Sequence, residues 1–297
     1  MQTLEIQSLR KSFGTKEVLK GFSFTASAGS AFGLLGRNGA GKTTTLRILM
    51  GVFPADGGQV LVDGAPIDRK KTTFGYLPEE RGLYPKLKIL DQLTYFAMLH
   101  GMTKANALSA CKKWLMRLEM WEEREKKPEM LSKGNQQKIQ LVTALAHDPA
   151  IVVLDEPFSG LDPVNARLLK DVVREEQARG KLILFSSHQM AAVEEFCDDI
   201  VLLHGGEAAL AGSLRELKRA EAPDTLLVRT GEAERLLREW GSRARLTESG
   251  EAAVSLRGEA RGAVMEKLVR SYDCESVRLM EPSLEDLFVK YAGGGAA

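Results

Sequence analysis

The hydrophobic positions of the first 35 residues fall in short runs, which glycine and charged residues interrupt. Apolar and polar positions alternate at the N-terminus, and a period of two is typical of a strand with one buried face, so we expect short strands between residues 4 and 35. The last run, residues 31–35, is apolar and leads directly into a glycine-rich loop and a helix. A further short strand and turn are expected at residues 59–64.

Apolar residues then change to a helical spacing. Residues 88–127 are rich in helix formers, and we expect a helical insertion over about 86–148. In LSKGNQQKIQL, at 131–141, Ser132 is placed to cap a helix that buries Ile139, Val142 and Leu145. Strands at 151–154 and 182–185 alternate with helices near 163–179 and 189–197, a pattern that predicts a parallel sheet with helices on its faces.

The chain changes character beyond Gly205-Gly206, and Gly212-Ser213 is expected to be a hinge into a second unit. The pattern of this unit, over 216–297, is strand 226–230, helix 232–240, strands 244–247 and 252–257, helix 260–271 and strand 276–280. The order β-α-β-β-α-β predicts a small α+β domain of the ferredoxin-like kind. We expect a last helix at 283–291, capped by Ser283, and a disordered GGGAA tail.

Composition is that of an ordinary globular protein. Of 297 residues, 44% are apolar, which is enough for one large domain or for one domain plus a smaller one. The formal charge of +1 gives no whole-molecule attraction to nucleic acid or to an anionic bilayer, and we expect no nucleic-acid partner.

Cysteine usage and hydropathy indicate the compartment. Cys111, Cys197 and Cys274 are far apart and form no CxxC pair, which disfavours a disulfide framework and a zinc site and favours reducing cytosol. The N-terminus lacks the apolar core of a signal peptide, and no apolar run approaches the ~20 residues of a spanning helix. A membrane role would therefore come from a partner.

The segment GRNGAGKT, at 36–43, fits GxxxxGK[ST] between an apolar strand and a helix. Its glycines allow backbone amides to converge on phosphate oxygens, and the helix terminus adds partial positive charge. Lys42 would reach the β- and γ-phosphates and Thr43 would bind Mg²⁺; the alternative is a glycine turn with an incidental lysine. The expected phosphate-binding residues are Gly36, Asn38, Gly39, Ala40, Gly41, Lys42, Thr43 and Thr44.

Two acids end the apolar strand IVVLDE, where a doubly wound sheet binds its ligands. Asp155 is suited to orient Mg²⁺, and Glu156 is suited to take a proton from an attacking water. The alternative is that both acids merely begin a helix.

Five segments, GRNGAGKT, LSKGNQQ, IVVLDEP, SGLD and SSH, follow in this order over residues 36–188. Together they resemble the ATP-binding subunits of ABC transporters over residues 1–215, while 216–297 resembles the accessory domains of export-type subunits. The resemblance implies an α/β fold: a P-loop NTPase core with a mostly parallel sheet, an N-terminal antiparallel β subdomain and the helical insertion. It also implies hydrolysis of ATP with Mg²⁺.

In that family two ATPase domains pack head to tail, so the resemblance implies that Ser132 and Gly134 of one copy contact the γ-phosphate held by the other. It also places Asp162 in the loop that crosses between the sites, His188 at the γ-phosphate and Phe13 on the adenine ring. From the residues alone, the alternatives are a helix cap for Ser132, a turn for Asp162, a structural histidine for His188 and a core phenylalanine for Phe13.

Three positions depart from the family pattern. Lys133 and Asn135 replace Gly and Gln of LSGGQ, and we expect Lys133 to face solvent. Glu79 stands where relatives have Gln; its carboxylate can ligate Mg²⁺ but cannot donate a hydrogen bond when ionised. We assign Glu79 to the metal, with a solvated acidic loop as the alternative. Residues 80–85 lie where relatives meet a transmembrane partner.

The resemblance therefore implies an ATP-hydrolysing homodimer on the cytoplasmic face of the cell membrane, which powers separate transmembrane permease subunits of an exporter. The alternative is a soluble ABC-type ATPase that acts on the ribosome or DNA. Such relatives usually join two ATPase halves or carry a coiled-coil arm, whereas this chain has one GxxxxGK[ST] loop, no sustained heptads and no basic stripe. Nothing in the sequence identifies the cargo.

Overall fold

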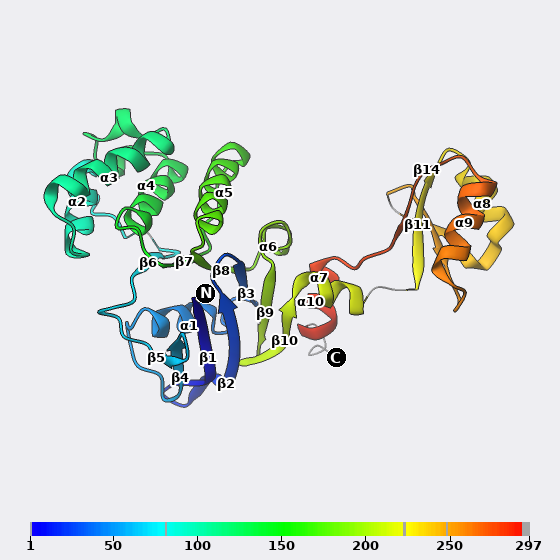
Figure 1. Cartoon of the computed structure of the whole chain (residues 1–297), viewed down its shortest axis with the longest axis horizontal. Coiled ribbons are helices and arrows are strands. Elements are labelled where there is room, and N and C mark those ends of the chain that lie inside the picture. The colour runs from blue at the N-terminus through cyan, green and yellow to red at the C-terminus, as the bar shows by residue number, and fades with distance from the viewer. Residues whose placement is uncertain (1, 81, 222–223, 248, 293–297) are drawn as a thin grey trace. The chain divides into compact units, whose positions relative to one another are not determined.

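The computed structural model describes residues 2–80, 82–221, 224–247 and 249–292 (Figure 1). Its contacts divide the chain into two units, Met1–Leu214 and Arg215–Ala297, and each unit is described by itself. The GGGAA tail, which we expected to be disordered, lies outside the described residues. Among the described helices, none combines the length and the apolar character that a membrane span requires.

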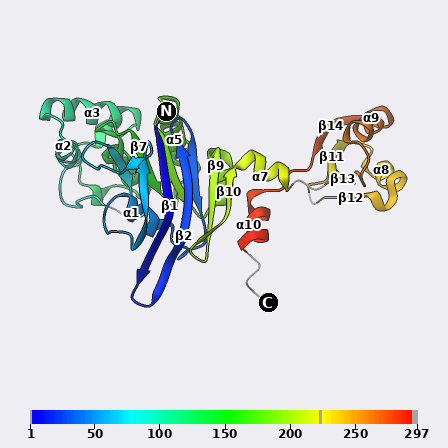
Figure 2. The same ribbon diagram turned by 60° about the horizontal axis from the view of Figure 1, so that its bottom comes forward.

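The first unit contains an antiparallel sheet near the N-terminus, with strand order β2-β1-β4-β5. Its strands are β1 (Thr3–Phe13), β2 (Lys16–Ser27), β4 (Gly57–Val62) and β5 (Ala65–Pro66). Figure 2 shows β1 and β2 as a long hairpin, whose register pairs Phe13 with Lys16 beside the turn. The alternating apolar positions of β1 are buried, as strand periodicity requires.

A second sheet of the same unit has the order β10-β9-β3-β8-β7-β6 and is parallel except for β10. Its strands are β3 (Ala31–Leu35), β6 (Phe74–Leu77), β7 (Ile151–Asp155), β8 (Leu182–Ser187), β9 (Asp199–His204) and β10 (Glu207–Ser213). The helices α1 (Lys42–Leu49), α5 (Pro163–Ala178) and α6 (Met190–Phe196) follow β3, β7 and β8 along the chain. One apolar core contains residues of both sheets, including Leu4, Leu34 and Val153. The expected α/β core is confirmed.

Gly212-Ser213, expected as a hinge into the second unit, lie directly before the boundary between the units but are part of a strand. Both residues belong to β10, where they pair with Ile200 and Asp199 of β9. The turn before β10 is Gly205-Gly206, whose positive φ angles of 58° and 87° suit a tight two-residue hairpin. The glycine pair therefore joins two strands of one sheet, and the helix α7 (Leu214–Ala220) begins directly after them.

The helical insertion consists of α2 (Ile89–Leu99), α3 (Lys104–Arg117), two short 3₁₀ turns (Trp121–Glu123 and Pro128–Met130) and α4 (Lys133–Leu145). The helices contact one another, and α4 also contacts β6. The contact between β6 and α4 is unusually close, because a Cβ atom added to Gly75 of β6 would lie 2.1 Å from the carbonyl oxygen of Ala144 in α4. The backbones of β6 and α4 therefore touch directly.

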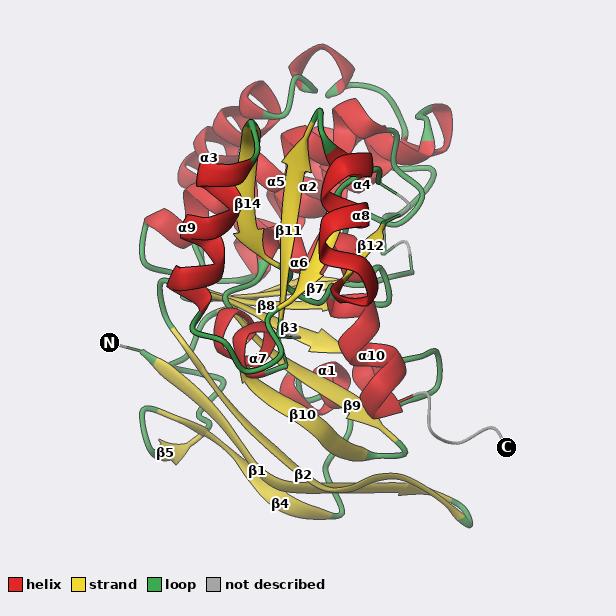
Figure 3. Cartoon of the chain, turned by 90° about the vertical axis from the view of Figure 1, so that its right-hand side faces the viewer, coloured by secondary structure: helices red, strands yellow, loops and turns green. Residues whose placement is uncertain are grey.

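The second unit has the predicted β-α-β-β-α-β order. Its elements are β11 (Thr225–Thr230), α8 (Ala233–Trp240), a 3₁₀ turn (Gly241–Arg243), β12 (Ala244–Leu246), β13 (Ala252–Ser255), α9 (Arg261–Ser271), β14 (Cys274–Leu279) and α10 (Leu284–Ala292). The sheet is antiparallel, with the order β12-β13-β11-β14, and α8 and α9 share a core with it (Figure 3). Ser283 caps α10, since its hydroxyl accepts a hydrogen bond from the Asp286 amide at 3.1 Å.

Candidate functional site

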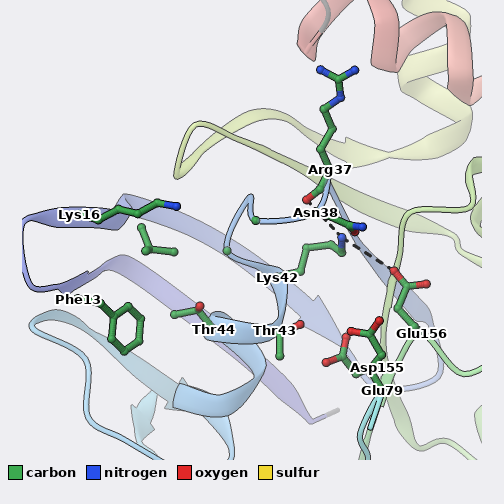
Figure 4. Close-up of a pocket in the computed structure, with 13 residues that line it drawn as sticks. Phe13, Lys16, Arg37, Asn38, Lys42, Thr43, Thr44, Glu79, Asp155 and Glu156 are labelled. Atoms are coloured by element: carbon green, nitrogen blue, oxygen red, sulfur yellow. Dashed lines mark hydrogen bonds and ion pairs between the residues drawn. The ribbon is translucent and has the colours of Figure 1, made fainter.

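A pocket of about 440 Å³ opens where β3 runs into α1, beside the end of β7 (Figure 4). The carboxyl ends of parallel strands are where this class of sheet binds ligands. The pocket brings together residues from four separate parts of the sequence. Of the predicted site residues, it is lined by Phe13, Asn38, Gly39, Gly41, Lys42, Thr43, Thr44, Glu79, Asp155 and Glu156.

The loop before α1 requires glycine at two positions for reasons of space. Gly41 has a φ of 111°, and a Cβ atom there would lie 2.6 Å from the Leu19 side chain. A Cβ atom at Gly36 would lie 2.6 Å from the Leu203 carbonyl oxygen. Ala40 donates its amide to the Arg37 carbonyl at 3.1 Å and, like Gly36, helps to form the loop without lining the pocket.

Lys42 is a buried cation inside this loop. Its amine donates to the Gly36 carbonyl at 2.7 Å and lies 3.9 Å from a Glu156 carboxylate oxygen. Burial lowers the pKa of Lys42, and the carboxylates of Glu156, Asp155 and Glu79 oppose this shift. Such a cation at a helix N-terminus suits a phosphate group.

Asp155 is almost completely buried and keeps one oxygen unsatisfied. The Ser186 hydroxyl donates to its Oδ1, whereas Oδ2 has no hydrogen-bond partner among the described residues. Burial raises the pKa of Asp155, and the Ser186 and Thr43 side chains oppose the rise. An unpaired buried oxygen costs about 1–3 kcal/mol, which a cation would offset.

The oxygen donors of this corner fit Mg²⁺. Asp155 and Glu79 supply carboxylates and Thr43 supplies a hydroxyl, and Figure 4 shows the three side chains close together. No group of three or more His, Cys, Asp or Glu side chains in the described chain forms a metal cage. Mg²⁺ is commonly held by one or two carboxylates together with substrate phosphates, so this partial set suits it.

Glu156 is held by several hydrogen bonds in an unusual backbone conformation. Its φ of 50° lies in the left-handed region, which costs a non-glycine residue about 1–3 kcal/mol. Its Oε2 accepts from the Ser187 hydroxyl at 3.0 Å, and its Oε1 accepts from the His188 amide at 2.9 Å. The His188 ring nitrogen Nδ1 lies 2.7 Å from the same oxygen. The structure therefore brings His188 to Glu156, although His188 does not line the pocket.

Phe13 presents an aromatic face at the other end of the pocket. Phe13 is 49% exposed, and its ring packs edge-on against Phe53, with 5.5 Å between ring centroids. A ring supported in this way can stack on a planar group.

Ser132, Gly134 and Asp162 do not line the pocket. Ser132 is exposed, and its hydroxyl accepts the Asn135 amide at 3.3 Å to cap α4. Asp162 caps α5 through the amides of Val164 and Asn165. A Cβ atom at Gly134 would lie 3.1 Å from the Asn165 side chain, so the N-terminal ends of α4 and α5 adjoin. Lys133 is exposed, as expected.

Sequence reasoning missed several residues of the site. Lys16, Val18 and Arg37 also line the pocket, and Ser186 and Ser187 hold the two carboxylates. The signal for Lys16 was present, because a residue opposite Phe13 across a tight hairpin turn faces the same side of the sheet.

Comparison with known proteins identifies the family of this chain. Residues 19–159 match the ABC transporter family, and residues 212–292 match the C-terminal domain of DrrA1-3-like ATP-binding proteins. The ABC transporter ATP-binding protein YhaQ of Bacillus subtilis (strain 168) is 39% identical over 98% of both chains. This chain belongs to the ATP-binding proteins of ABC transporters.

A further relative and a solved structure are similar to 73% of this chain. The Nod factor export ATP-binding protein I of Burkholderia lata is 34% identical over 73% of each chain. A solved structure of the ATP-binding subunit of an ABC transporter is 31% identical, with a TM-score of 0.68, and the match covers 73% of this chain and 92% of that one. Both matches agree with an ATP-binding role for this ABC protein.

Proposed function

We propose that the chain hydrolyses ATP with Mg²⁺. The observation that carries the proposal is the convergence of Lys42, Asp155 and Glu156 in one pocket beside a glycine-rich loop. Lys42 and the loop amides would bind the β- and γ-phosphates, and Phe13 would stack on the base. Thr43, Asp155 and Glu79 would hold Mg²⁺, which offsets phosphate charge when bound.

Glu156 is the residue we assign to proton transfer. It is fixed by Ser187 and His188 and lies 3.9 Å from the Lys42 amine, so its carboxylate is aimed at the region where the γ-phosphate would lie. A carboxylate held there can accept a proton from a water that attacks the phosphate. His188 would orient Glu156 and contact the γ-phosphate.

We further propose that two copies complete each ATP site. Ser132, Gly134 and Asp162 lie outside the pocket of their own chain, yet Ser132 and Gly134 stand at the N-terminus of α4, which suits an anion. In a head-to-tail dimer these residues would cover the nucleotide of the other copy. The γ-phosphate, absent from ADP, would supply the differential contact that drives closure.

The closed dimer would drive separate transmembrane permease subunits, from the cytoplasmic face of the membrane. Export is favoured by the Nod factor export protein among the relatives. Residues 1–215 would form the ATPase domain, and 216–297 an accessory domain.

The decisive variant is Glu156→Gln, which preserves the size of the side chain and removes the base. A general base contributes about 10²–10⁴-fold to the rate, so we expect turnover to fall by that factor while ATP still binds. With ATP the variant should form a dimer in light scattering, and with ADP a monomer. Normal turnover would remove Glu156 from its role, and an ATP-loaded monomer would contradict the composite site.

Purification of the tagged chain from gently solubilised membranes tests the proposed partner. A polytopic protein should accompany the chain. Recovery only with ribosomes or DNA would favour the alternative, a soluble ABC-type ATPase.

A further inference from the structure

Lys16 lies on the nucleotide pocket because of the register of the β1–β2 hairpin. Phe13 and Lys16 are directly opposite each other, and opposed residues of an antiparallel pair point to the same face of the sheet. Val18, two residues further along β2, points the same way. All three side chains line the pocket, so the hairpin presents an aromatic ring and a cation side by side.

The amine of Lys16 has no partner within the part of the chain that the structure describes, in contrast to its neighbours. Lys11 forms an ion pair with Asp56 at 2.7 Å, and Arg10 forms one with Glu17 at 3.3 Å. Neither a hydrogen bond nor an ion pair of the Lys16 side chain occurs among the described residues. Lys16 is therefore available to a ligand.

The position of Lys16 along the pocket determines which part of a bound nucleotide its amine would contact. Figure 4 shows Phe13 and Lys16 at one end, Lys42 in the middle, and Glu79, Asp155 and Glu156 at the other end. A nucleotide with its base on Phe13 and its β- and γ-phosphates at Lys42 would pass its ribose and α-phosphate close to Lys16.

Electrostatics favours the α-phosphate over the ribose. The three carboxylates lie at the far end of the pocket, and the Lys42 amine in the middle already bonds Gly36 and approaches Glu156. The near end has no carboxylate among its described lining residues. A lysine ammonium is donor-only and binds phosphate as a point charge.

We propose that Lys16 is a positioning residue that binds the α-phosphate of the nucleotide. The inference rests on the proposed nucleotide site and adds a contact that no motif of the sequence identifies. Because the α-phosphate is the same before and after hydrolysis, the contact stabilises ATP and ADP equally. Such uniform binding lowers KM and leaves kcat unchanged.

The test compares four ligands, adenosine, AMP, ADP and ATP, on the full-length wild type and on Lys16→Ala. Dissociation constants are measured by competition against a fluorescent ADP analogue. Because the contact is exposed and charge-assisted, we expect Lys16→Ala to raise the dissociation constants of AMP, ADP and ATP by the same factor, about three- to tenfold. Adenosine should bind both proteins equally. Lys16→Arg should restore binding, and Lys70→Ala, at an exposed lysine outside the pocket, should match the wild type.

Other outcomes overturn the assignment. Weaker binding of adenosine would place the contact on the base or ribose, and a loss limited to ADP and ATP would place it on the β-phosphate. Unchanged binding of all four ligands would leave Lys16 without a role. In each case the wild type still binds ATP, whereas failure of the proposed function would appear as a wild type that binds no triphosphate.

Discussion

Single residues at this site act through partners that are distant in sequence. Glu156 follows β7, and the Ser187 and His188 groups that hold it follow 31 and 32 positions later at the end of β8. Because β7 and β8 are adjacent and parallel, their carboxyl ends meet and these contacts form. The Asp-Glu pair could be predicted from its strand context. The hydroxyls that fix it could not, because no local pattern states which strands are neighbours.

His188→Ala tests whether His188 orients Glu156. We expect ATP affinity to change little and turnover to fall about ten- to hundredfold, because the carboxylate loses one of its hydrogen bonds. Turnover and equilibrium ATP binding are measured on the same preparation. His188→Asn, whose amide can still donate, should recover part of the rate. A loss in ATP affinity with unchanged kcat would instead limit His188 to a ground-state contact with the nucleotide.

His147, which lies away from the pocket, should make the free energy of unfolding depend on pH. Its Nε2 donates to the Phe74 carbonyl at 2.9 Å, and its ring stacks on His100 at 3.8 Å between centroids. Burial lowers the pKa of His147 to about 4; His100 and Lys181 add to this shift, and the Phe74 carbonyl and Asp148 oppose it. The unfolded chain, with a histidine pKa near 6.5, therefore binds the proton first as the pH falls.

We accordingly expect the free energy of unfolding to be highest above pH 6.5 and to fall between pH 6.5 and 4. The contribution of His147 is at most about 3 kcal/mol. Urea unfolding at several pH values measures it. His147→Gln, whose amide can still donate to Phe74, should flatten the slope, and His204→Gln, at an exposed histidine, should not. An unchanged slope in His147→Gln would contradict the assignment.

At the scale of elements, the helix α4 gives Ser132 two roles, one observed and one proposed. In the structure Ser132 is the N-cap, bonded to the Asn135 amide, and in our proposal it also contacts the phosphate of a second copy. The periodicity of the sequence predicted the helix and its cap correctly, whereas the second role rests on resemblance.

Two substitutions separate these roles. Ser132→Ala should lower the free energy of unfolding by about 1 kcal/mol, because the cap is lost. Ser132→Asp keeps a good cap, and its negative charge near the N-terminus of α4 is favourable. It should retain stability yet abolish ATP-dependent dimerisation, because the carboxylate would repel the γ-phosphate. Thermal unfolding and light scattering measure the two effects. Normal dimerisation of Ser132→Asp would exclude a close phosphate contact.

The β9–β10 hairpin shows where sequence reasoning about elements failed. The sequence indicates a change of character beyond Gly205-Gly206 and a hinge at Gly212-Ser213, yet the first pair is a hairpin turn and Gly212 lies within an edge strand. Glycine marks turns, bulges and strand edges alike, and only the partner strand distinguishes them. The partner strand β9 lies in the sheet next to β3, a pairing that local sequence does not reveal.

For the whole molecule, two separate apolar cores predict two unfolding transitions. The core of the second unit is formed by its own residues, among them Leu226, Leu236 and Leu268. Leu226→Ala removes a fully buried side chain, at a cost of about 2–5 kcal/mol. Calorimetry of the variant should show the transition of the second unit at a lower temperature. The transition of the first unit, which ATP stabilises in the wild type, should not change. A single transition that moves as a whole would show that the units unfold together.

The order of elements in the second unit, from β11 to α10, followed from the periodicity of its sequence. The pairing of the sheets and the stacking of the two histidines depend on contacts between distant segments. They became visible only in three dimensions.

The direct backbone contact between Gly75 and Ala144 has a mechanical consequence. Because no side chain separates the backbones of β6 and α4 at this point, a displacement of one element would displace the other. Glu79 lies two residues beyond the end of β6, and Ser132 stands at the start of α4. The strand and the helix would then move together, with the carboxylate that we propose as a Mg²⁺ ligand near the end of one and the residues that we propose for contact with a second copy at the start of the other.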